Sequence, residues 1–303
     1  MAALPRVLAI VGPTGTGKTE LACELARRTG AEIIGCDSMQ VYRGMDIGTA
    51  KPSPELRAQI PHHGIDLVAP DEPMSAGRFA EYARKAALEI LQRGRPVILC
   101  GGSGLYARAF VGGLISSVEA DPLLRAELEA RSTESLLTEL RRSDPESARR
   151  IPPRDRVRIV RALEIALLIG RPASAIRSQH GFEDRPFDVR WLGIAVERDA
   201  LVLRLRRRVD RMFAEGLVEE VRSLHAAGYT QELRPLRSIG YREVAWLLEA
   251  RIGEAEAREA TVHSTRRYAK RQRTWFRAER ELEWVSGSDP AAVLSRGLAL
   301  LEV

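Results

Sequence analysis

Short apolar runs alternate with amphipathic stretches over the first third of the chain. The runs that predict strands are Val7–Val11, Glu32–Cys36, Ile65–Val68 and Val97–Cys100. Helical periodicity marks Glu20–Arg28 and Ser75–Arg93, and the second stretch places Phe79, Tyr82, Ala83, Ala86 and Ile90 on one face. Strands that alternate with helices are typical of a parallel sheet covered on both faces. The pattern therefore predicts an α/β fold with a parallel sheet flanked by helices.

The strand pattern stops near Ser116, and only helical periods follow until His180. These predicted helices are Leu123–Arg131, Ser135–Arg142 and Arg156–Ile169, the last followed by Gly170. A strand at Val189–Val196 then returns the chain to the sheet. The later elements are predicted helices at Leu201–Glu215, Val218–Ala226, Tyr241–Leu248 and Glu254–Arg280, and a short strand at Leu282–Val285. We interpret residues 116–180 as an inserted all-helical domain, and residues 1–115 and 181–303 as the catalytic core.

Composition is that of a globular protein. The chain has 303 residues, of which 45% are hydrophobic, and no apolar run is long enough to span a membrane. The first predicted strand begins so early that no signal peptide is expected. The scattered cysteines Cys23, Cys36 and Cys100 lack metal-ligand spacing and are interpreted as reduced core residues. We expect a cytoplasmic protein and, because no interface signal stands out, a monomer.

Positive charge is concentrated near the C-terminus. The net charge is +6, and between His263 and Arg280 the only acid is Glu279. The basic residues there are Arg266, Arg267, Lys270, Arg271, Arg273, Arg277 and Arg280. Such a cluster either binds phosphate backbones or forms a solvated helix face.

Residues 12–19 match the phosphate-binding pattern G-x-x-x-x-G-K-[ST] in full. They are Gly12, Pro13, Thr14, Gly15, Thr16, Gly17, Lys18 and Thr19. The motif lies between a predicted strand and a predicted helix, which is the context it needs. Backbone amides, the helix N-terminus, the lysine and the threonine hydroxyl together hold a phosphate chain. The sequence therefore predicts a site for a phosphorylated compound.

Asp37 follows the second predicted strand, at the sheet edge that also carries the phosphate loop. In such sheets the active site lies at the carboxyl ends of the strands. From the residues alone, Asp37 is either a ligand of Mg²⁺ or a general base acting on an acceptor held against the phosphorylated donor. A capping role without chemistry is the third interpretation.

The chain resembles the bacterial tRNA dimethylallyltransferases, also called tRNA isopentenyltransferases, over essentially its whole length. The motifs that carry the resemblance are Gly12–Thr19, Asp37–Pro52, Gly101–Tyr106, Arg158–Glu164, Ile239–Tyr241 and Thr265–Phe276. The segment Asp37–Pro52, which reads DSMQVYRGMDIGTAKP, is the most specific of them.

The resemblance implies transfer of a dimethylallyl group from dimethylallyl diphosphate to the exocyclic amine of the adenosine immediately 3′ of a tRNA anticodon. Asp37 would take the proton of that amine. The phosphate loop, Lys18 and Thr19, with Mg²⁺ bound at Thr19, would hold the diphosphate, so the loop would serve a prenyl diphosphate rather than ATP. Ser103 stands where the family usually has threonine, beside the acceptor and leaving group. Arg208, in the arginine-rich stretch Arg204–Arg211, either contacts the leaving diphosphate or belongs to a solvated face.

The resemblance also implies positions that contact the anticodon stem-loop. They are Asp37, Ser38, Met39, Gln40 and Ser103; Arg125, Val157, Arg158, Ile159, Val160 and Arg161; Arg237, Ser238, Ile239, Gly240, Tyr241 and Arg242; and Lys270, Arg271, Gln272, Arg273, Thr274, Trp275, Phe276 and Arg277. Val157 departs from the polar residue usual in the family and cannot hydrogen-bond a base edge. Trp275 and Phe276 either stack on a base or belong to the core. The target adenosine must be flipped out of its stack to reach Asp37.

Two other functions are compatible with the phosphate loop. An enzyme that prenylates free adenine nucleotides would share the loop and Asp37, but it would not need the helical insertion or the basic helix. In a P-loop kinase or nucleotide switch we expect a later strand to end in aspartate, whereas the run Val97–Cys100 ends in Gly101-Gly102.

The pair His62-His63 lacks a third ligand for a metal site. No cysteine follows Cys100, so the zinc module of eukaryotic relatives is not expected.

Overall fold

The computed structural model describes residues 4–113, 121–180 and 184–301. The chain forms two compact units, of which the first comprises Met1–Val111 and Pro186–Val303 and the second Gly112–Arg185. The domain limits predicted at residues 115–116 and at 181 lie outside the described residues, whereas His180, the predicted last residue of the insertion, is the last residue of a helix.

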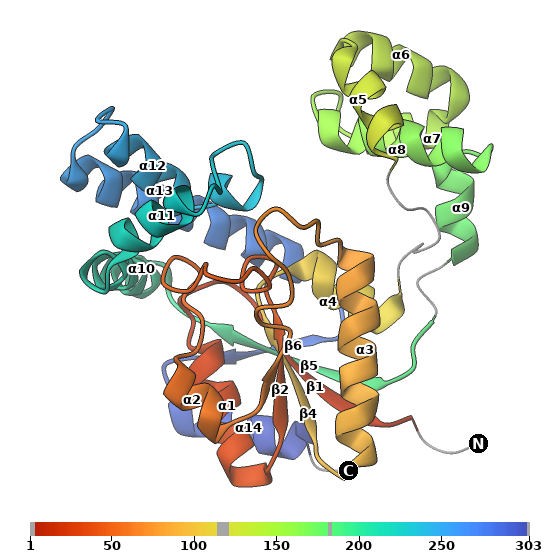
Figure 1. The fold of residues 1–303 in the computed structure, drawn as a ribbon. Coiled ribbons are helices and arrows are strands. Elements are labelled where there is room, and N and C mark those ends of the chain that lie inside the picture. The colour runs from red at the N-terminus through yellow and green to blue at the C-terminus, as the bar shows by residue number, and fades with distance from the viewer. Residues whose placement is uncertain (1–3, 114–120, 181–183, 302–303) are drawn as a thin grey trace. The chain divides into compact units, whose positions relative to one another are not determined.

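A parallel sheet forms the centre of the first unit (Figure 1). In the described part of the chain its strands, in spatial order, are β3 (His62–His63), β2 (Glu32–Cys36), β4 (Val97–Gly101), β1 (Arg6–Val11), β5 (Asp188–Ala195) and β6 (Leu282–Ser286). All neighbouring pairs are parallel, so every strand ends at the same edge. The predicted α/β class is confirmed.

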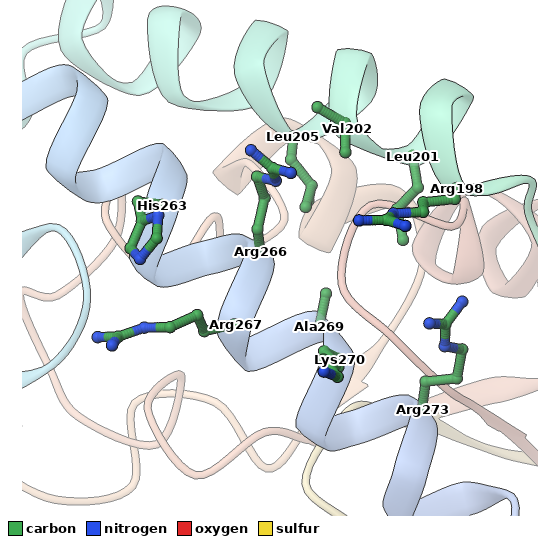
Figure 2. Close-up of a pocket in the computed structure, with 10 residues that line it drawn as sticks. All are labelled: Arg198, Leu201, Val202, Leu205, His263, Arg266, Arg267, Ala269, Lys270 and Arg273. Atoms are coloured by element: carbon green, nitrogen blue, oxygen red, sulfur yellow. The ribbon is translucent and has the colours of Figure 1, made fainter.

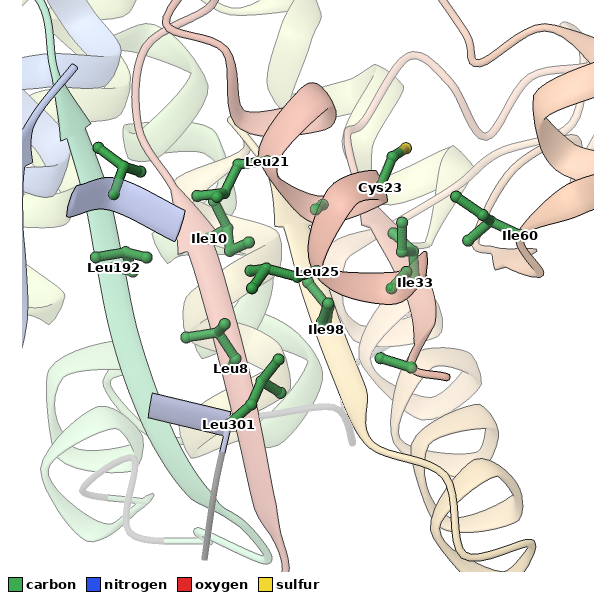
Figure 3. Packing of buried hydrophobic residues seen from close by; sticks show 14 of the residues in the cluster. Leu8, Ile10, Leu21, Cys23, Leu25, Ile33, Ile60, Ile98, Leu192 and Leu301 are labelled. Atoms are coloured by element: carbon green, nitrogen blue, oxygen red, sulfur yellow. The ribbon is translucent and has the colours of Figure 1, made fainter. Parts of the chain in front are cut away.

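Helices cover both faces of this sheet (Figure 1). On one face, Leu8 and Ile10 of β1 pack against Leu21 and Leu25 of α1 (Lys18–Thr29) and against Leu301 of α14 (Pro290–Leu301), as Figure 3 shows. The opposite face is covered by α3 (Ala76–Gln92), which contacts β2 and β4. Burial of these apolar side chains is the main force that holds the layers together.

The remaining helices of the first unit lie beyond the carboxyl edge of the sheet or on its flanks. They are α2 (Pro54–Gln59), α4 (Gly104–Gly112), α10 (Arg198–Ala214), α11 (Leu217–Ala226), the short 3₁₀ helix η1 (Pro235–Arg237), α12 (Tyr241–Leu248) and α13 (Glu254–Phe276). Helix α13 contacts both α10 and α12. The sheet edge is therefore overlaid by helices that carry many of the predicted functional residues.

The second unit is all-helical in its described part. Its helices are α5 (Pro122–Ala130), α6 (Thr133–Ser143), α7 (Pro145–Arg150), α8 (Arg156–Ile169) and α9 (Ala173–His180). Leu128, Leu136, Leu140, Ile159 and Leu163 meet in its core. Helix α8 ends at Gly170 in the left-handed conformation, as the sequence predicts.

Several predicted elements are wrong or missing. The third strand is His62–His63 rather than Ile65–Val68, because Gly64 and Asp66 have positive φ angles that interrupt an extended backbone. Tyr82 is exposed rather than on the buried face of α3. Helix α13 ends at Phe276, not at Arg280. Helices α2, α4, α7, α9 and α14 were not predicted, most of them being too short for a clear periodic signal.

Candidate active site

The phosphate loop connects β1 to α1 at the carboxyl edge of the sheet. Gly15 has a φ of +81°, which side-chain-bearing residues rarely adopt, and a Cβ there would lie 2.7 Å from the Leu205 side chain of α10, which would have to shift. Thr16 Oγ1 donates to Pro13 O at 3.0 Å, and Lys18 Nζ donates to the same oxygen at 2.6 Å. The amides at the start of α1 follow Gly17, which has no side chain to cap them. The loop thus offers the amides and the helix N-terminus that an anion requires.

Lys18 is a buried cation beside Asp37 and Arg208. Burial, helped by the charge of Arg208, lowers the pKa of Lys18 from 10.5 to about 8, while Cys100 and Asp37 act in the opposite direction. The thiol of Cys100 is not the reactive group here, since burial raises its pKa to about 12. A bound anion would restore the charge of Lys18. A phosphate ligand would therefore raise the pKa of Lys18 and keep its ammonium group charged.

Asp37 and Ser103 lie side by side after neighbouring strands. Asp37 follows β2, and its Oδ1 accepts a hydrogen bond from Met39 N at 2.8 Å. Ser103 follows β4, and its Oγ accepts from Ser38 N at 2.9 Å and contacts Ser38 Oγ at 3.2 Å. Because β2 and β4 are paired, the structure brings these two predicted residues together. Ser103 holds the backbone next to Asp37 in place.

Arg208 faces the site and is not on a solvated surface. Burial lowers the pKa of its guanidinium, and the largest opposing influence is the charge of Asp37. Its Nη2 lies 3.5 Å from Thr49 O, so this contact links α10 to the loop that contains Thr49. The solvated-face interpretation is wrong, because α10 turns this arginine toward the sheet edge.

Tyr268 is a site residue that sequence reasoning cited only as part of a motif. Burial raises the pKa of its phenol, although hydrogen bonds with Ser103 and Gln272 act in the opposite direction. The hydroxyl therefore stays protonated and is a donor or acceptor at the site. The sequence pattern could have predicted this position of Tyr268. It shares one face of α13 with Thr261, Thr265 and Gln272, which recur with helical spacing.

Two hollows of the first unit meet at Asp37. A cleft of about 890 Å³ is lined by the phosphate loop with Lys18 and Thr19, and by the arginines of α10, namely Arg204, Arg207, Arg208 and Arg211. A cavity of about 370 Å³ on the other side is lined by Tyr268 and Arg271 of α13 and by Arg237, Ser238 and Ile239. Thr14, Asp37 and Arg208 line both hollows. We call them the diphosphate cleft and the acceptor cavity.

The segment Arg237–Arg242 divides between the acceptor cavity and the core. Arg237, Ser238, Ile239 and Arg242 line the cavity, and Arg242 is held by Glu243 and by Ser264 Oγ at 3.2 Å. Gly240 and Tyr241 are buried. The Tyr241 ring is fully buried, and its hydroxyl donates to Glu220 at 2.6 Å. The predicted RNA contact by the Tyr241 side chain is therefore wrong.

The segment Lys270–Arg277 turns its residues to different sides of α13. Arg271 lines the acceptor cavity, while Lys270 and Arg273 line a groove between α13 and α10 (Figure 2). Thr274 Oγ1 donates to Lys270 O at 3.0 Å. Arg277 is exposed, and it lines a further hollow together with Arg273.

Two residues of this segment are buried, and a third is half-buried. Gln272 is buried against the phosphate loop, and Phe276 is buried in the core, so neither side chain reaches an RNA surface. Trp275 is half-buried and packs under the Arg108 guanidinium, 4.9 Å from its ring centroid. The stacking interpretation is wrong for Phe276 because burial leaves its ring no free face.

In the second unit, α8 presents two of its predicted RNA-contacting residues and buries two others. Val157 and Arg158 are exposed, whereas Ile159 and Val160 belong to the helical core and cannot contact RNA through their side chains. Arg125 and Arg161 both bind the buried Glu164 carboxylate, each at 2.6 Å. That shared acid fixes the two arginines on α5 and α8.

The residues that could hold a metal are few. Among the described residues no cluster of three or more His, Cys, Asp or Glu side chains has the arrangement of a metal site. His62 and His63 instead bond Ile60 O and the Glu32 carboxylate, each at 2.7 Å. The exposed Thr19 hydroxyl at the start of α1 fits a Mg²⁺ ion whose other ligands are phosphate oxygens and water.

Within the part of the chain that is described, no helix is long and apolar enough to cross a bilayer.

Comparison with known proteins agrees with this geometry. The family model described as IPP transferase matches residues 40–279. The chain belongs to the IPP transferase family. The phosphate loop and Asp37 lie before the matched region of the chain, and the acceptor cavity lies largely within it. The resemblance found in the sequence is confirmed.

This chain aligns with its relatives over nearly its whole length. It is 50% identical over 284 residues to a tRNA dimethylallyltransferase of Geobacter sulfurreducens, covering 92% of this chain and 91% of the relative. A solved tRNA isopentenylpyrophosphate transferase from Bacillus halodurans has 36% identity and a TM-score of 0.69, covering 97% and 98% of the two chains. A eukaryotic dimethylallyltransferase acting on tRNA has 28% identity and a TM-score of 0.83, covering 94% of this chain and 74% of the other.

Proposed function

We propose that this protein is a tRNA dimethylallyltransferase. It transfers the dimethylallyl group of dimethylallyl diphosphate to the exocyclic N6 amine of the adenosine 3′ of the anticodon and releases diphosphate. The observation that carries the proposal is the meeting of the diphosphate cleft and the acceptor cavity at Asp37. The names of the similar proteins support the substrate. Because this substrate is tRNA, we place the enzyme in the cytoplasm. We infer a monomer because no interface signal stands out in the sequence.

The donor binds with its diphosphate in the phosphate loop. Amides at the start of α1, Lys18 and Arg208 meet its negative charge from several sides. Thr19 would hold Mg²⁺ together with the diphosphate oxygens, and Mg²⁺ when bound neutralises charge on the leaving group. Burial strengthens these interactions because little water competes with them. The prenyl carbon is thereby directed toward Asp37.

The acceptor adenosine enters the cavity from the other side after leaving its stack. Its N6 lone pair is delocalised into the ring, so the amine is a poor nucleophile. As the N–C bond forms and the C–O bond to diphosphate breaks, one N6 proton moves to a carboxylate oxygen of Asp37. The Ser103–Ser38 contact and the Met39 amide fix the position of that carboxylate. A positioned base of this kind contributes about 10²- to 10⁴-fold in rate.

RNA recognition would involve the cationic residues that are not buried. In the first unit these include Arg237 and Arg271 at the acceptor cavity. In the second unit they include Arg125, Arg158 and Arg161, which lie together on α5 and α8. Contacts of this kind repay the few kcal/mol that base flipping costs.

The test uses purified protein, Mg²⁺ and radiolabelled dimethylallyl diphosphate, with unmodified tRNA, AMP or ATP supplied separately. We expect label in tRNA and none in AMP. Label in AMP alone would assign the protein to the enzymes that prenylate free nucleotides. Hydrolysis of ATP without label transfer would assign it to the nucleotide hydrolases or kinases.

A further inference from the structure

The hydroxyl of Ser103 is at the centre of a small group of hydroxyls beside Asp37. Its Oγ accepts from Ser38 N at 2.9 Å and lies 3.2 Å from Ser38 Oγ. From the other side, α13 brings the Tyr268 hydroxyl within hydrogen-bonding reach of Ser103. A serine hydroxyl has one proton and two lone pairs, so three partners occupy it completely. The Tyr268 hydroxyl is therefore the partner that completes the hydrogen bonding of Ser103.

The backbone of Ser103 is fixed, but its side chain depends on these partners. Ser103 N donates to Cys36 O at 3.2 Å, and Ser103 O accepts from Ala107 N at 3.0 Å. A serine side chain is unbranched at Cβ and can occupy three rotamers, whereas the branched side chain of threonine is restricted at χ1. The rotamer of Ser103 is therefore selected by the groups that hydrogen-bond with its hydroxyl.

Tyr268 itself is held firmly enough to serve as such a partner. Gln272, one turn further along α13, is buried against the phosphate loop. Residues four apart lie on the same face of a helix, so this anchor also fixes where Tyr268 meets the sheet edge. Tyr268 lines the acceptor cavity, and burial raises the pKa of its phenol, so the hydroxyl keeps its proton at neutral pH.

We propose that Tyr268 is a positioning residue for prenyl transfer, whose hydroxyl holds Ser103 in the rotamer that fixes the backbone next to Asp37. The inference rests on the proposed function, which assigns proton transfer to Asp37. A small displacement of a base slows the reaction without weakening the binding of substrates. A Tyr268 hydroxyl that instead bonded the flipped base would act independently of Ser103, and the test separates the two roles.

The test removes the hydroxyl with Tyr268→Phe, alone and combined with Ser103→Ala or Ser103→Thr, and includes both serine variants alone. The kcat and the KM values for dimethylallyl diphosphate and tRNA are measured for each variant, and thermal melts check that the variants fold. Tyr82→Phe is the matched control. It removes the same atom from an exposed tyrosine of α3 that lies outside the acceptor cavity.

We expect Tyr268→Phe to lower kcat about tenfold through the loss of one hydrogen bond, with both KM values unchanged. In the Ser103→Ala background the same change should have no further effect, because the two hydroxyls act as one unit. Ser103→Thr should restore most of the rate that Tyr268→Phe loses, because a branched side chain restricts its own rotamer. Tyr82→Phe should match the wild type.

A wild-type kcat for Tyr268→Phe overturns the proposal. A further loss of rate in the Ser103→Ala background also overturns it, and would place the Tyr268 hydroxyl in direct contact with the acceptor base. The same holds if threonine fails to restore the rate while Ser103→Thr alone is fully active. Wild-type protein that transfers no label to tRNA would instead contradict the proposed function.

Discussion

The side chain of Gln272 is hydrogen-bonded to the backbone of Thr14 across 258 residues of sequence. Gln272 Oε1 accepts from Thr14 N at 2.9 Å. The other end of the same amide, Nε2, donates to Gly102 O at 2.9 Å. One buried side chain of α13 thus joins the phosphate loop to the segment after β4. The shape of the diphosphate cleft depends on a helix that also lines the acceptor cavity.

Gln272→Glu should weaken binding of the donor. A carboxylate can still accept from Thr14 N, but it cannot donate to Gly102 O and it brings negative charge to the cleft. We expect the Kd for dimethylallyl diphosphate to rise about tenfold or more, from the loss of one buried hydrogen bond and added repulsion. Calorimetry with the donor measures this. Thr274→Ala is the matched control, because within the described ranges the side chain of that exposed residue bonds only to its own helix. An unchanged Kd would show that the bridge does not shape the cleft.

Binding of the donor should depend on pH through the titration of Lys18. Since its pKa is lowered to about 8, the lysine loses its charge between pH 7 and pH 9 in the free enzyme. Affinity for inorganic diphosphate should therefore fall as the pH rises through 8, and Lys18→Ala should be weaker throughout and flat over this range. Binding measured across these pH values tests it. A pH dependence that persists in Lys18→Ala would assign the titration to another group.

The same lowered pKa makes Lys18 costly for folding. The folded-state pKa lies below the unfolded value of 10.5, so the unfolded chain binds more protons between pH 8 and 10.5. The cost is full below pH 8 and disappears as the pH rises toward 10.5. Lys18→Met should therefore raise Tm at pH 7 without ligand, and this gain should shrink by pH 10. A lower Tm at pH 7 would contradict the account.

Glu220 should control the loop that follows Met45. Its carboxylate accepts from the backbone amides of Asp46 at 2.9 Å, Ile47 at 2.7 Å and Gly48 at 3.1 Å, as well as from Tyr241. Glu220→Gln turns one acceptor into a donor facing these amides. Loss of a hydrogen-bond acceptor for these amides costs about 1–3 kcal/mol. Because the loop adjoins the Thr49–Arg208 contact, we expect its displacement to lower kcat about tenfold.

The control for this change is Glu219→Gln, an exposed neighbour whose carboxylate lies 3.4 Å from Arg222. It should leave kcat unchanged. Steady-state kinetics with both substrates at saturation separates the two variants. Equal activity of both would show that the carboxylate does not hold the loop.

Glu164 should be required for the stability of the helical insertion. It is fully buried and shared by Arg125 and Arg161, which are each about one-third exposed. Glu164→Gln removes the charge that compensates them. We expect a loss of about 1–3 kcal/mol, less than for a wholly buried pair because water screens the arginines. Hydrogen exchange of α5 and α8 measures this, with Arg158→Gln as the exposed control. Unchanged exchange would contradict the role of Glu164.

Apart from its third strand, the sheet was predicted well from the sequence, as was the phosphate loop, because both depend on local patterns. The runs around Leu8 and Ile34 are buried on both faces, and the motif ending at Thr19 has a fixed backbone geometry. The sequence predicted poorly which side chains lie on the surface. A contiguous motif such as Lys270–Arg277 winds around a helix, so Gln272 and Phe276 turn inward while Lys270 turns outward. Tyr268 becomes a site residue only because α13 packs over the sheet edge, which no local pattern specifies.

The central claim is that Asp37 is the base for prenyl transfer, and Asp37→Asn tests it most directly. Single-turnover transfer to tRNA is measured with donor, RNA and Mg²⁺ all saturating, and with Mg²⁺ also raised well above that level. We predict a rate about 10²- to 10⁴-fold lower, with both substrates bound as tightly as by the wild type and no recovery at high Mg²⁺. A wild-type rate, or recovery at high Mg²⁺, would contradict the claim and make Asp37 a bystander or a metal ligand.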